Sequence, residues 1–375
     1  MPRPLSRREC LVHGAQTLGV LALASRPSTS RAADSPNAAA LTTRGVEFLR
    51  PRQAEDGSWS GNRKEPGITA LVVTALLRSK RVTPAEPVVT KALGYLEGFL
   101  SPKGGLAEAA HANYSTAIAI MAFQEANKGG RYDATIKGGQ EFLKAMQWDA
   151  SHGKDKDSDF YGGAGYGGKN NRPDLSNTAF MLDALHDTGI PADDPAFQRA
   201  LVFVSRCQNL KSEFNDQAWA GKVNDGGFIY TAANGGSSVA GPSENGGLRS
   251  YASMTYAGLK SMIYAGLKRD DPRVKAAFEY ITKNYSLDEN PGLGQRGLYY
   301  YYQTFAKTLA VLGESTLVDA SGKSHDWRAE LTAALAKRQA PNGSWTNPAD
   351  NFMEGDPNLV TAYALLALAY AQPAR

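Results

Sequence analysis

A repeated apolar segment dominates the pattern of hydrophobic and polar positions along this chain. Each copy begins at a threonine and continues as an Ala-rich apolar run, with a small residue six positions later and a large apolar residue seven positions later. Segments that are apolar on nearly every side are typical of buried helices, and small residues at a fixed spacing let neighbouring helices approach closely. The pattern therefore predicts six buried helices, near whose starts lie Thr69, Thr116, Thr178, Thr255, Thr304 and Thr361.

An amphipathic segment precedes each of these apolar segments. Its mark is an aromatic residue followed by an aliphatic one, as in Phe48-Leu49, whereas the sixth copy carries Ala334-Leu335. Lys, Arg and Glu stand between the apolar positions, which is the periodicity of a helix with one face in solvent. In four copies a glutamine follows the mark by five residues, at Gln53, Gln147, Gln208 and Gln339.

A Gly-rich turn joins the two segments of a pair. Two of its copies are Asp56-Gly57-Ser58-Trp59 and Asn342-Gly343-Ser344-Trp345. Asp or Asn followed by Gly is typical of turns, because glycine adopts positive φ without steric cost. We interpret the recurring Gln and Trp side chains as structural: Gln ties a helix end to the neighbouring turn, and Trp packs across the hairpin.

Six helical hairpins in a row favour a ring. A single hairpin cannot bury its apolar helix, whereas hairpins stacked side by side can. An open solenoid with capping repeats is the alternative, but neither the first nor the last copy has an obviously polar face. We therefore expect one domain over residues 44–372, with the apolar helices inside the ring and the amphipathic helices outside.

The N-terminus has the pattern of an export signal. Arg7-Arg8 precedes a largely apolar stretch from Leu11 to Ala24, and small residues follow around Ala32. This order indicates a removable signal of the twin-arginine type over residues 1–33, followed by a short linker over residues 34–43. The apolar stretch is too short and too polar to span a membrane. We expect export to the periplasm or cell envelope, with no integral membrane segment in the mature chain.

Charge and cysteine content further limit the possible functions. The chain has 41 Lys+Arg and 37 Asp+Glu, and residues 1–33 hold five Arg and one Glu, so that 36 residues of each sign remain without them. A neutral domain gives no electrostatic reason to expect nucleic acid as a partner. Cys207 is the one cysteine beyond the signal, which leaves neither an intramolecular disulfide nor a cysteine-rich metal site.

The turns and helix starts resemble those of a known family. The segments Gln53 to Trp59 and Gln339 to Trp345 are similar to the Gln-Trp repeats of squalene–hopene cyclases, and Thr-Ala starts such as Thr69-Ala70 resemble that family's inner barrel helices. The resemblance covers residues 44–370. It implies an all-α (α/α)6 toroid of six helical hairpin repeats, which terpene cyclases share with protein prenyltransferase β-subunits, and an isoprenoid substrate, triterpene or polyprenyl, in a central cavity.

The acid motif of the cyclases is absent. The resemblance implies an Asp-x-Asp-Asp run directly before a Thr-Ala helix start, whose central acid is kept neutral and strongly acidic by its neighbours. The four residues before each threonine hold no such run here; Glu65 and Asp174 are the acidic residues in them, each in the outermost position. Asp174 is therefore the candidate catalytic acid, with Asn177 as its hydrogen-bonding neighbour.

Metal sites are not indicated by the sequence. Protein prenyltransferases, as a family, bind zinc through Asp, Cys and His. Here Cys207 stands on a predicted outer helix, where it is better interpreted as a small packing residue, and the histidines lack ligand spacing. The acidic run from Asp155 to Asp159 lies in a long loop; it could supply oxygen ligands to a divalent cation, but we favour solvated surface charges. We expect no metal and no other cofactor.

Long insertions in repeats three to five predict a pocket. Insertions in ring repeats gather at one mouth, and these are rich in Gly and Tyr. Aromatic walls suit an isoprenoid chain, whose developing carbocations they stabilise by cation–π attraction, and they suit sugar rings equally well. Close-packed loops without a pocket are the alternative. The candidate substrate-binding residues are Asn177, Tyr166, Arg249, Tyr251 and Tyr301.

Three functional hypotheses follow. The first is a terpene cyclase- or prenyltransferase-like protein that acts on or binds an isoprenoid. The second is an exported carbohydrate-active enzyme on an α/α barrel, which needs two carboxylates facing one cleft. The third is a non-catalytic binding or scaffold ring. A central cavity filled by side chains would support this third hypothesis. We favour the first because the resemblance covers nearly the whole domain.

Overall fold

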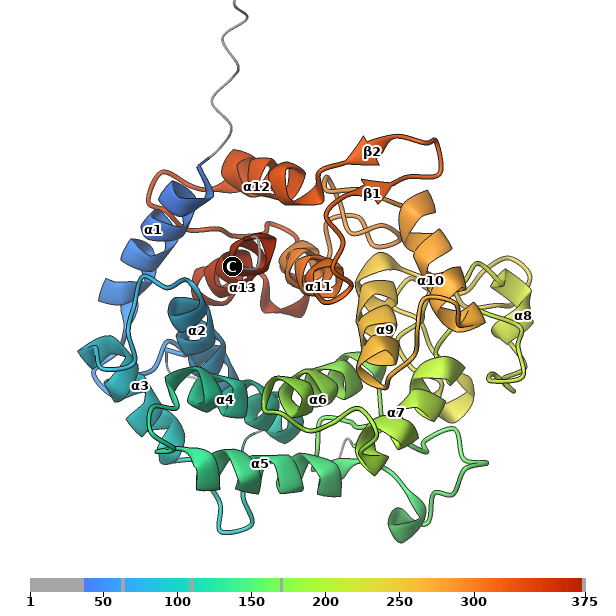
Figure 1. Cartoon of the computed structure of the whole chain (residues 1–375), viewed down its shortest axis with the longest axis horizontal. Coiled ribbons are helices and arrows are strands. Elements are labelled where there is room, and N and C mark those ends of the chain that lie inside the picture. Colours follow the sequence, from blue (N-terminus) through green and yellow to red (C-terminus); the bar gives the residue numbers. More distant parts are fainter. Residues whose placement is uncertain (1–36, 62–64, 108, 110, 169–170, 373–375) are drawn as a thin grey trace, which may run out of the picture. The chain divides into compact units, whose positions relative to one another are not determined.

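The threonine-marked apolar segments form the inner layer of a ring of helices, and the amphipathic segments form the outer layer (Figure 1). This computed structural model describes residues 37–61, 65–107, 109, 111–168 and 171–372; the expected export signal lies outside them. The inner helices are α2 (Pro66–Arg78), α4 (Ala112–Ala126), α6 (Leu175–Asp187), α9 (Ala252–Tyr264), α11 (Leu298–Val311) and α13 (Pro357–Ala371). The outer helices are α1 (Ala38–Leu49), α3 (Pro87–Glu97), α5 (Asp133–Met146), α7 (Pro195–Arg206), α10 (Pro272–Lys283) and α12 (Trp327–Arg338).

Short elements fill the connections. Helix α8 (Ala220–Val223) lies in the long connection between α7 and α9, and a small hairpin of β1 (Leu317–Val318) and β2 (Ser324–His325) joins α11 to α12. Single 3-10 turns cover Arg50–Arg52, Ala150–His152, Ala233–Gly235 and Asn351–Met353. Helix α1 begins at Ala38, so the first outer helix includes part of the segment expected as a linker; Asn37 caps it by accepting the Ala39 amide at 2.9 Å.

The ring is closed. Each inner helix packs on its two neighbours, and the last, α13, packs on the first, α2. Gln339 in the sixth repeat also donates to the Leu41 carbonyl in the first, at 3.0 Å. The (α/α)6 toroid is thereby confirmed, and closure is favourable because it leaves no apolar helix face at an open end.

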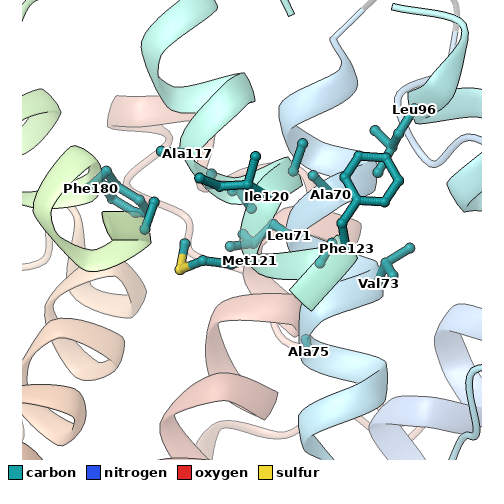
Figure 2. Close-up of a cluster of buried hydrophobic side chains, with 14 of the residues drawn as sticks. Ala70, Leu71, Val73, Ala75, Leu96, Ala117, Ile120, Met121, Phe123 and Phe180 are labelled. Carbon is teal, nitrogen blue, oxygen red and sulfur yellow. The ribbon is translucent and has the colours of Figure 1, made fainter. Parts of the chain in front are cut away.

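Small residues let the inner helices approach closely. Ala70 on α2 and Ala117 on α4 are fully buried, and larger side chains such as Leu71, Ile120 and Phe123 fill the space around them (Figure 2). Burial of side chains of this size stabilises the fold by about 1.5–3 kcal/mol each. The alternation of small and large residues read from the sequence therefore determines how tightly the inner layer packs.

The recurring threonine ties the turn to its inner helix in five of the six repeats. Its Oγ1 accepts the backbone N–H of the residue that ends the turn, as between Trp59 and Thr69 at 3.1 Å. The same bond recurs at Thr116, Thr178, Thr255 and Thr361, with donor–acceptor distances of 2.9 to 3.2 Å. The pattern in the sequence thus reflects a repeated need to satisfy one buried backbone donor.

The recurring glutamine and glycine join neighbouring repeats. The Gln147 side-chain amide donates to the carbonyls of Gly162 in its own turn and Ala196 at the start of the next outer helix, both at 2.9 Å. Glycine is required in these turns: Gly57 has φ +92°, and a Cβ there would come within 2.5 Å of the Lys91 carbonyl oxygen. The structural interpretation of Gln is confirmed. Trp likewise packs across the hairpin, since the Trp59 indole donates to the Leu49 carbonyl at 2.8 Å.

Replacement of Gln147 by Met is expected to lower the free energy of unfolding by about 2 kcal/mol or more, because two buried carbonyls lose their donor. Gln198 offers a matched control: its amide also donates to two carbonyls, but at an exposed position where water replaces it. Gln198→Met should change stability by less than about 0.5 kcal/mol. Denaturant unfolding of both variants measures the difference, and equal losses would contradict the linking role of Gln147.

In the part of the chain that the structure describes, no helix has the length and apolarity needed to cross a bilayer.

Candidate functional site

A cavity of about 440 Å³ lies inside the ring, at the N-terminal ends of the inner helices. Its volume falls in the range of about 300–1,000 Å³ that is usual for small-molecule sites. The insertions of repeats three to five meet there, as expected, through Tyr166, Tyr230, Tyr251 and Asn290. Phe352 and Met353, which precede α13, lie at the same end.

The wall is largely apolar, and most inner helices contribute apolar side chains to it. They include Leu71 on α2, Ile118 on α4, Phe180 on α6 and Leu359 on α13. The rings of Phe180 and Tyr300 stack with centroids 6.2 Å apart. This wall can exclude water from an apolar ligand, whose transfer out of water contributes about 25 cal/mol per Å² of buried surface.

Hydroxyl groups form a second part of the wall. The Tyr114 hydroxyl donates to Ser176 Oγ at 2.7 Å, and Ser176 Oγ lies 2.9 Å from the Tyr300 hydroxyl. The hydroxyls of Tyr166 and Tyr230 lie 3.0 Å apart. Because burial raises the pKa of these tyrosines, they remain neutral and can both donate and accept hydrogen bonds.

Asp174 is buried behind this wall. It caps α6: one carboxylate oxygen accepts the Asn177 backbone amide and the other accepts the Asn177 side-chain amide, both at 2.8 Å. Burial raises the pKa of Asp174 to about 6, while the hydrogen bonds with Asn177 and with the Tyr230 hydroxyl hold it down. Asp174 is not among the residues that line the cavity, whereas Tyr230, whose hydroxyl influences the pKa of Asp174, does line it.

The other candidate residues separate into two groups. Tyr166 and Tyr251 line the cavity. Asn177 is fully buried next to it, and its side chain accepts from Asn113 at 3.1 Å as well as donating to Asp174. Arg249 and Tyr301 lie elsewhere.

The positions of Arg249 and Tyr301 have simple physical reasons. The Arg249 guanidinium folds back on its own loop and donates to the Ala240 carbonyl. Successive residues on an α-helix differ in direction by about 100°, so that Tyr300 lines the cavity while Tyr301 points into the core. The Tyr301 hydroxyl donates to the Ser286 carbonyl at 2.8 Å.

Several cavity residues were not among the candidates from the sequence, and Glu65, His111 and Tyr230 are three of them. Glu65 is the N-cap of α2 and His111 the N-cap of α4, and their side chains lie 3.3 Å apart. The sequence does carry a signal for Glu65 and His111, since each of these two residues directly precedes an inner helix, as Asp174 does. Tyr230 lies far from any helix start along the chain, and the sequence carries no such signal for it.

The Phe352–Met353 tip at the cavity mouth is held in an unusual conformation. Both residues have positive φ, +63° and +64°, and Phe352 is 56% exposed. Such backbone conformations cost about 1–3 kcal/mol each and persist only where neighbouring contacts hold them. The next residue, Glu354, supplies those contacts: its buried carboxylate accepts the backbone amides of Tyr299 and Tyr300 at the start of α11.

The opposite end of the ring interior carries buried charges that are paired with one another. Asp183 lies 2.7 Å from Lys260 and 2.9 Å from Lys307, and Asp187 pairs with Lys307 and Arg78 at 2.9 and 2.8 Å. A hollow of about 380 Å³ borders this cluster. Glu125, which pairs with Arg78 at 2.7 Å, brings the cluster to three cations and three carboxylates. Because these charges balance, we interpret the cluster as a structural closure of the ring rather than as a ligand site.

Metal ligation finds no support among the residues that the structure describes, where no group of three or more His, Cys, Asp or Glu side chains could hold an ion. Cys207 is buried and its pKa is raised by burial, as fits a packing residue. In the acidic loop, the carbonyls of Lys156 and Ser158 accept hydrogen bonds from Arg206 at 2.7 Å, while Asp155 and Asp157 remain exposed.

Comparison with known proteins defines the fold class. No protein-family model matches the sequence, and no curated protein matches it either. Among solved structures, the chain shares the α/α toroid of type II terpene cyclases and protein prenyltransferases.

Three structures illustrate this similarity. A variant of the type II terpene cyclase MstE from Scytonema aligns over 89% of this chain and 96% of its own, with a TM-score of 0.54 and 14% identity. A protein from Actinoplanes aligns over 89% and 99%, with a TM-score of 0.51 and 17% identity. Protein geranylgeranyltransferase-I of Candida albicans, complexed with GGPP, aligns over 88% and 90%, with a TM-score of 0.50 and 15% identity. Identities of this size establish the shared fold and leave the activity to be argued from the cavity.

Proposed function

We propose that this protein binds an isoprenoid, a triterpene or a polyprenyl chain, in the cavity at the N-terminal ends of its inner helices. The observation that carries the proposal is a cavity of about 440 Å³ whose wall is largely aliphatic and aromatic. Two proteins of the same fold support it, since MstE has been captured with its substrate geranylgeranyl dihydroxybenzoate and the Candida geranylgeranyltransferase with GGPP.

We propose binding rather than cyclisation because Asp174, the candidate acid, is a weak one. Protonation of an isolated double bond needs a strong acid, whereas burial raises the pKa of Asp174 to about 6 and makes it weaker than an ordinary aspartic acid. The group also caps α6 behind the wall. Asp174 remains the acid that we expect to act in any turnover, and Asp174→Asn should then abolish turnover while leaving binding intact.

Two alternatives receive less support. A carbohydrate-active enzyme needs two carboxylates at one cleft. Among the described residues, Glu65 is the acid that lines this cavity, whereas Asp174 is turned towards Asn177 and the Glu354 carboxylate is turned towards the start of α11. A scaffold ring would have its centre filled by side chains, and the volume left open here speaks against that.

Native mass spectrometry of the purified protein after incubation with squalene and with polyprenols tests the binding proposal. We expect one isoprenoid per chain. Ile118→Trp should reduce binding at least about tenfold, because the larger side chain occupies volume that the ligand needs.

A tryptophan away from the cavity provides the control. Val318→Trp on the exposed strand β1 adds the same side chain at a position that is 54% exposed, and it should bind like the parent protein. Absence of any bound isoprenoid in the parent protein would overturn the proposal. Equal loss in both variants would show that the tryptophan disturbs the fold rather than the cavity.

We further propose that the chain is exported through the twin-arginine route. Arg7→Lys with Arg8→Lys keeps the positive charge but removes the paired guanidinium groups, and it should shift the full-length protein from the periplasmic to the cytoplasmic fraction of a bacterial host. Immunoblots of the two fractions measure this shift. Unchanged periplasmic accumulation of the double variant would contradict the route.

A further inference from the structure

We infer that the isoprenoid carries a neutral hydroxyl head group, which binds to a polar arc formed by Glu65, His111, Tyr166 and Tyr230 on one side of the cavity. This inference rests on the proposed function and deepens it, because it states which end of the ligand the protein recognises.

The arc begins with an ion-pair-like contact between two inner helices. His111 Nδ1 lies 3.3 Å from Glu65 Oε2, and both side chains line the cavity. The side chain of His111 is 42% exposed and that of Glu65 is 23% exposed, so the pair lies where the cavity opens and is accessible to a ligand. Helices α2 and α4 pack directly on each other, which fixes the pair in place.

Aromatic contacts continue the arc. The Tyr166 ring lies edge-on to His111, with centroids 5.4 Å apart, and its hydroxyl lies 3.0 Å from that of Tyr230. Behind Tyr230 lies the buried Asp174 carboxyl group, whose pKa the nearby Tyr230 hydroxyl helps to lower. Four polar groups from different repeats therefore adjoin a wall that is otherwise largely apolar, with Ile68, Leu71 and Met254 as examples.

A hydroxyl group matches this arc chemically. Its proton can be donated to the Glu65 carboxylate, of which one oxygen already contacts His111, and its oxygen can accept from a tyrosine hydroxyl. A pure hydrocarbon would leave these polar groups without partners when it displaces water, which is costly. A diphosphate would bring several negative charges towards the Glu65 carboxylate, and like charges at short range repel.

Three ligands that differ only at one end test the inference: geranylgeraniol, its methyl ether and its diphosphate. The methyl ether retains the oxygen acceptor but has no proton to donate. For the parent protein we expect the alcohol to bind at least about tenfold more tightly than either of the others, as a hydrogen bond to a charged group allows. Titration with detection by native mass spectrometry or intrinsic tyrosine and tryptophan fluorescence gives the three dissociation constants.

Variants assign the selectivity to the arc. Glu65→Gln should reduce the preference for the alcohol over the diphosphate, measured as the ratio of their dissociation constants, by about tenfold. The substitution removes the negative charge and keeps the shape of the side chain. Glu47 on the exposed face of α1 provides a matched control, since Glu47→Gln makes the same chemical change away from the cavity and should leave all three constants unchanged. Thermal unfolding of each variant verifies that it is folded.

The possible outcomes separate the two proposals. If all three ligands bind equally, or if the diphosphate binds most tightly, the hydroxyl head group is wrong while isoprenoid binding stands. If the alcohol is preferred but Glu65→Gln and Glu47→Gln behave alike, the arc does not recognise it. If none of the three ligands nor squalene binds, the proposed function itself fails.

Discussion

Replacement of Asp183 by Asn is expected to lower the free energy of unfolding by about 3–5 kcal/mol, the range observed when one partner of a buried ion pair is removed. Among the described residues, Asp183 is the carboxylate that pairs with Lys260, at 2.7 Å. The Lys260 side chain is only 2% exposed, and desolvation already lowers its pKa. Without Asp183 this lysine must either lose its proton or remain charged in an apolar interior, and both are unfavourable.

A second substitution distinguishes the charge effect from a packing effect. In the double variant Asp183→Asn with Lys260→Met, Lys260 is gone and Lys307 keeps its pair with Asp187, so that we expect much of the stability to return. Asp157→Asn in the exposed loop is the control and should change stability by less than about 0.5 kcal/mol. Denaturant unfolding measures all three. A double variant less stable than the single one would show that Lys260 is held by contacts other than this pair.

The stability of the protein is expected to fall by about 3 kcal/mol between pH 4.5 and pH 7 through the titration of Glu354 alone. Burial raises the pKa of Glu354 from 4.5 to about 7, against the hydrogen bonds from Asn347 and the amides at the start of α11. The folded state therefore binds a proton that the unfolded state has already released within this interval. Stability from this group is fully present below pH 4.5 and is lost as the pH rises through about 7.

Glu354→Gln should flatten that part of the pH profile, because an amide does not titrate. The side chain is fully buried, so that solvent screening does not weaken the effect. Asp174→Asn is the comparison. Burial also raises the pKa of Asp174, from 3.8 to about 6, so the part of the pH profile that this variant flattens should lie at lower pH than for Glu354. Free energies of unfolding at half-unit intervals from pH 4.5 to 8 measure both. The proposed role of Glu354 would be refuted if the variant kept the slope of the parent protein.

The repeat architecture follows from the amino-acid sequence alone. Six threonine-marked apolar segments and their amphipathic partners predicted the two layers of helices, and each repeated residue has one repeated contact: Thr69 accepts a turn amide, Gln147 joins two repeats, and Gly57 makes room for a carbonyl. Each of these motifs is local and recurs along the chain, so the sequence displays them without a fold. The position of the cavity at the ends of the inner helices where the insertions meet was also predictable on the same ground.

Which side chains form the site depends on how the repeats pack in three dimensions. A turn of about 100° per residue separates Tyr300 in the cavity wall from Tyr301 in the core, and no pattern in a run of four tyrosines distinguishes them. Glu65 and His111 are 46 residues apart in sequence and meet because two inner helices pack side by side. Asp174 was found from its place before a helix, yet its burial behind Tyr230 depends on a distant loop. Packing between repeats sets these distances, and a sequence read one repeat at a time does not contain them.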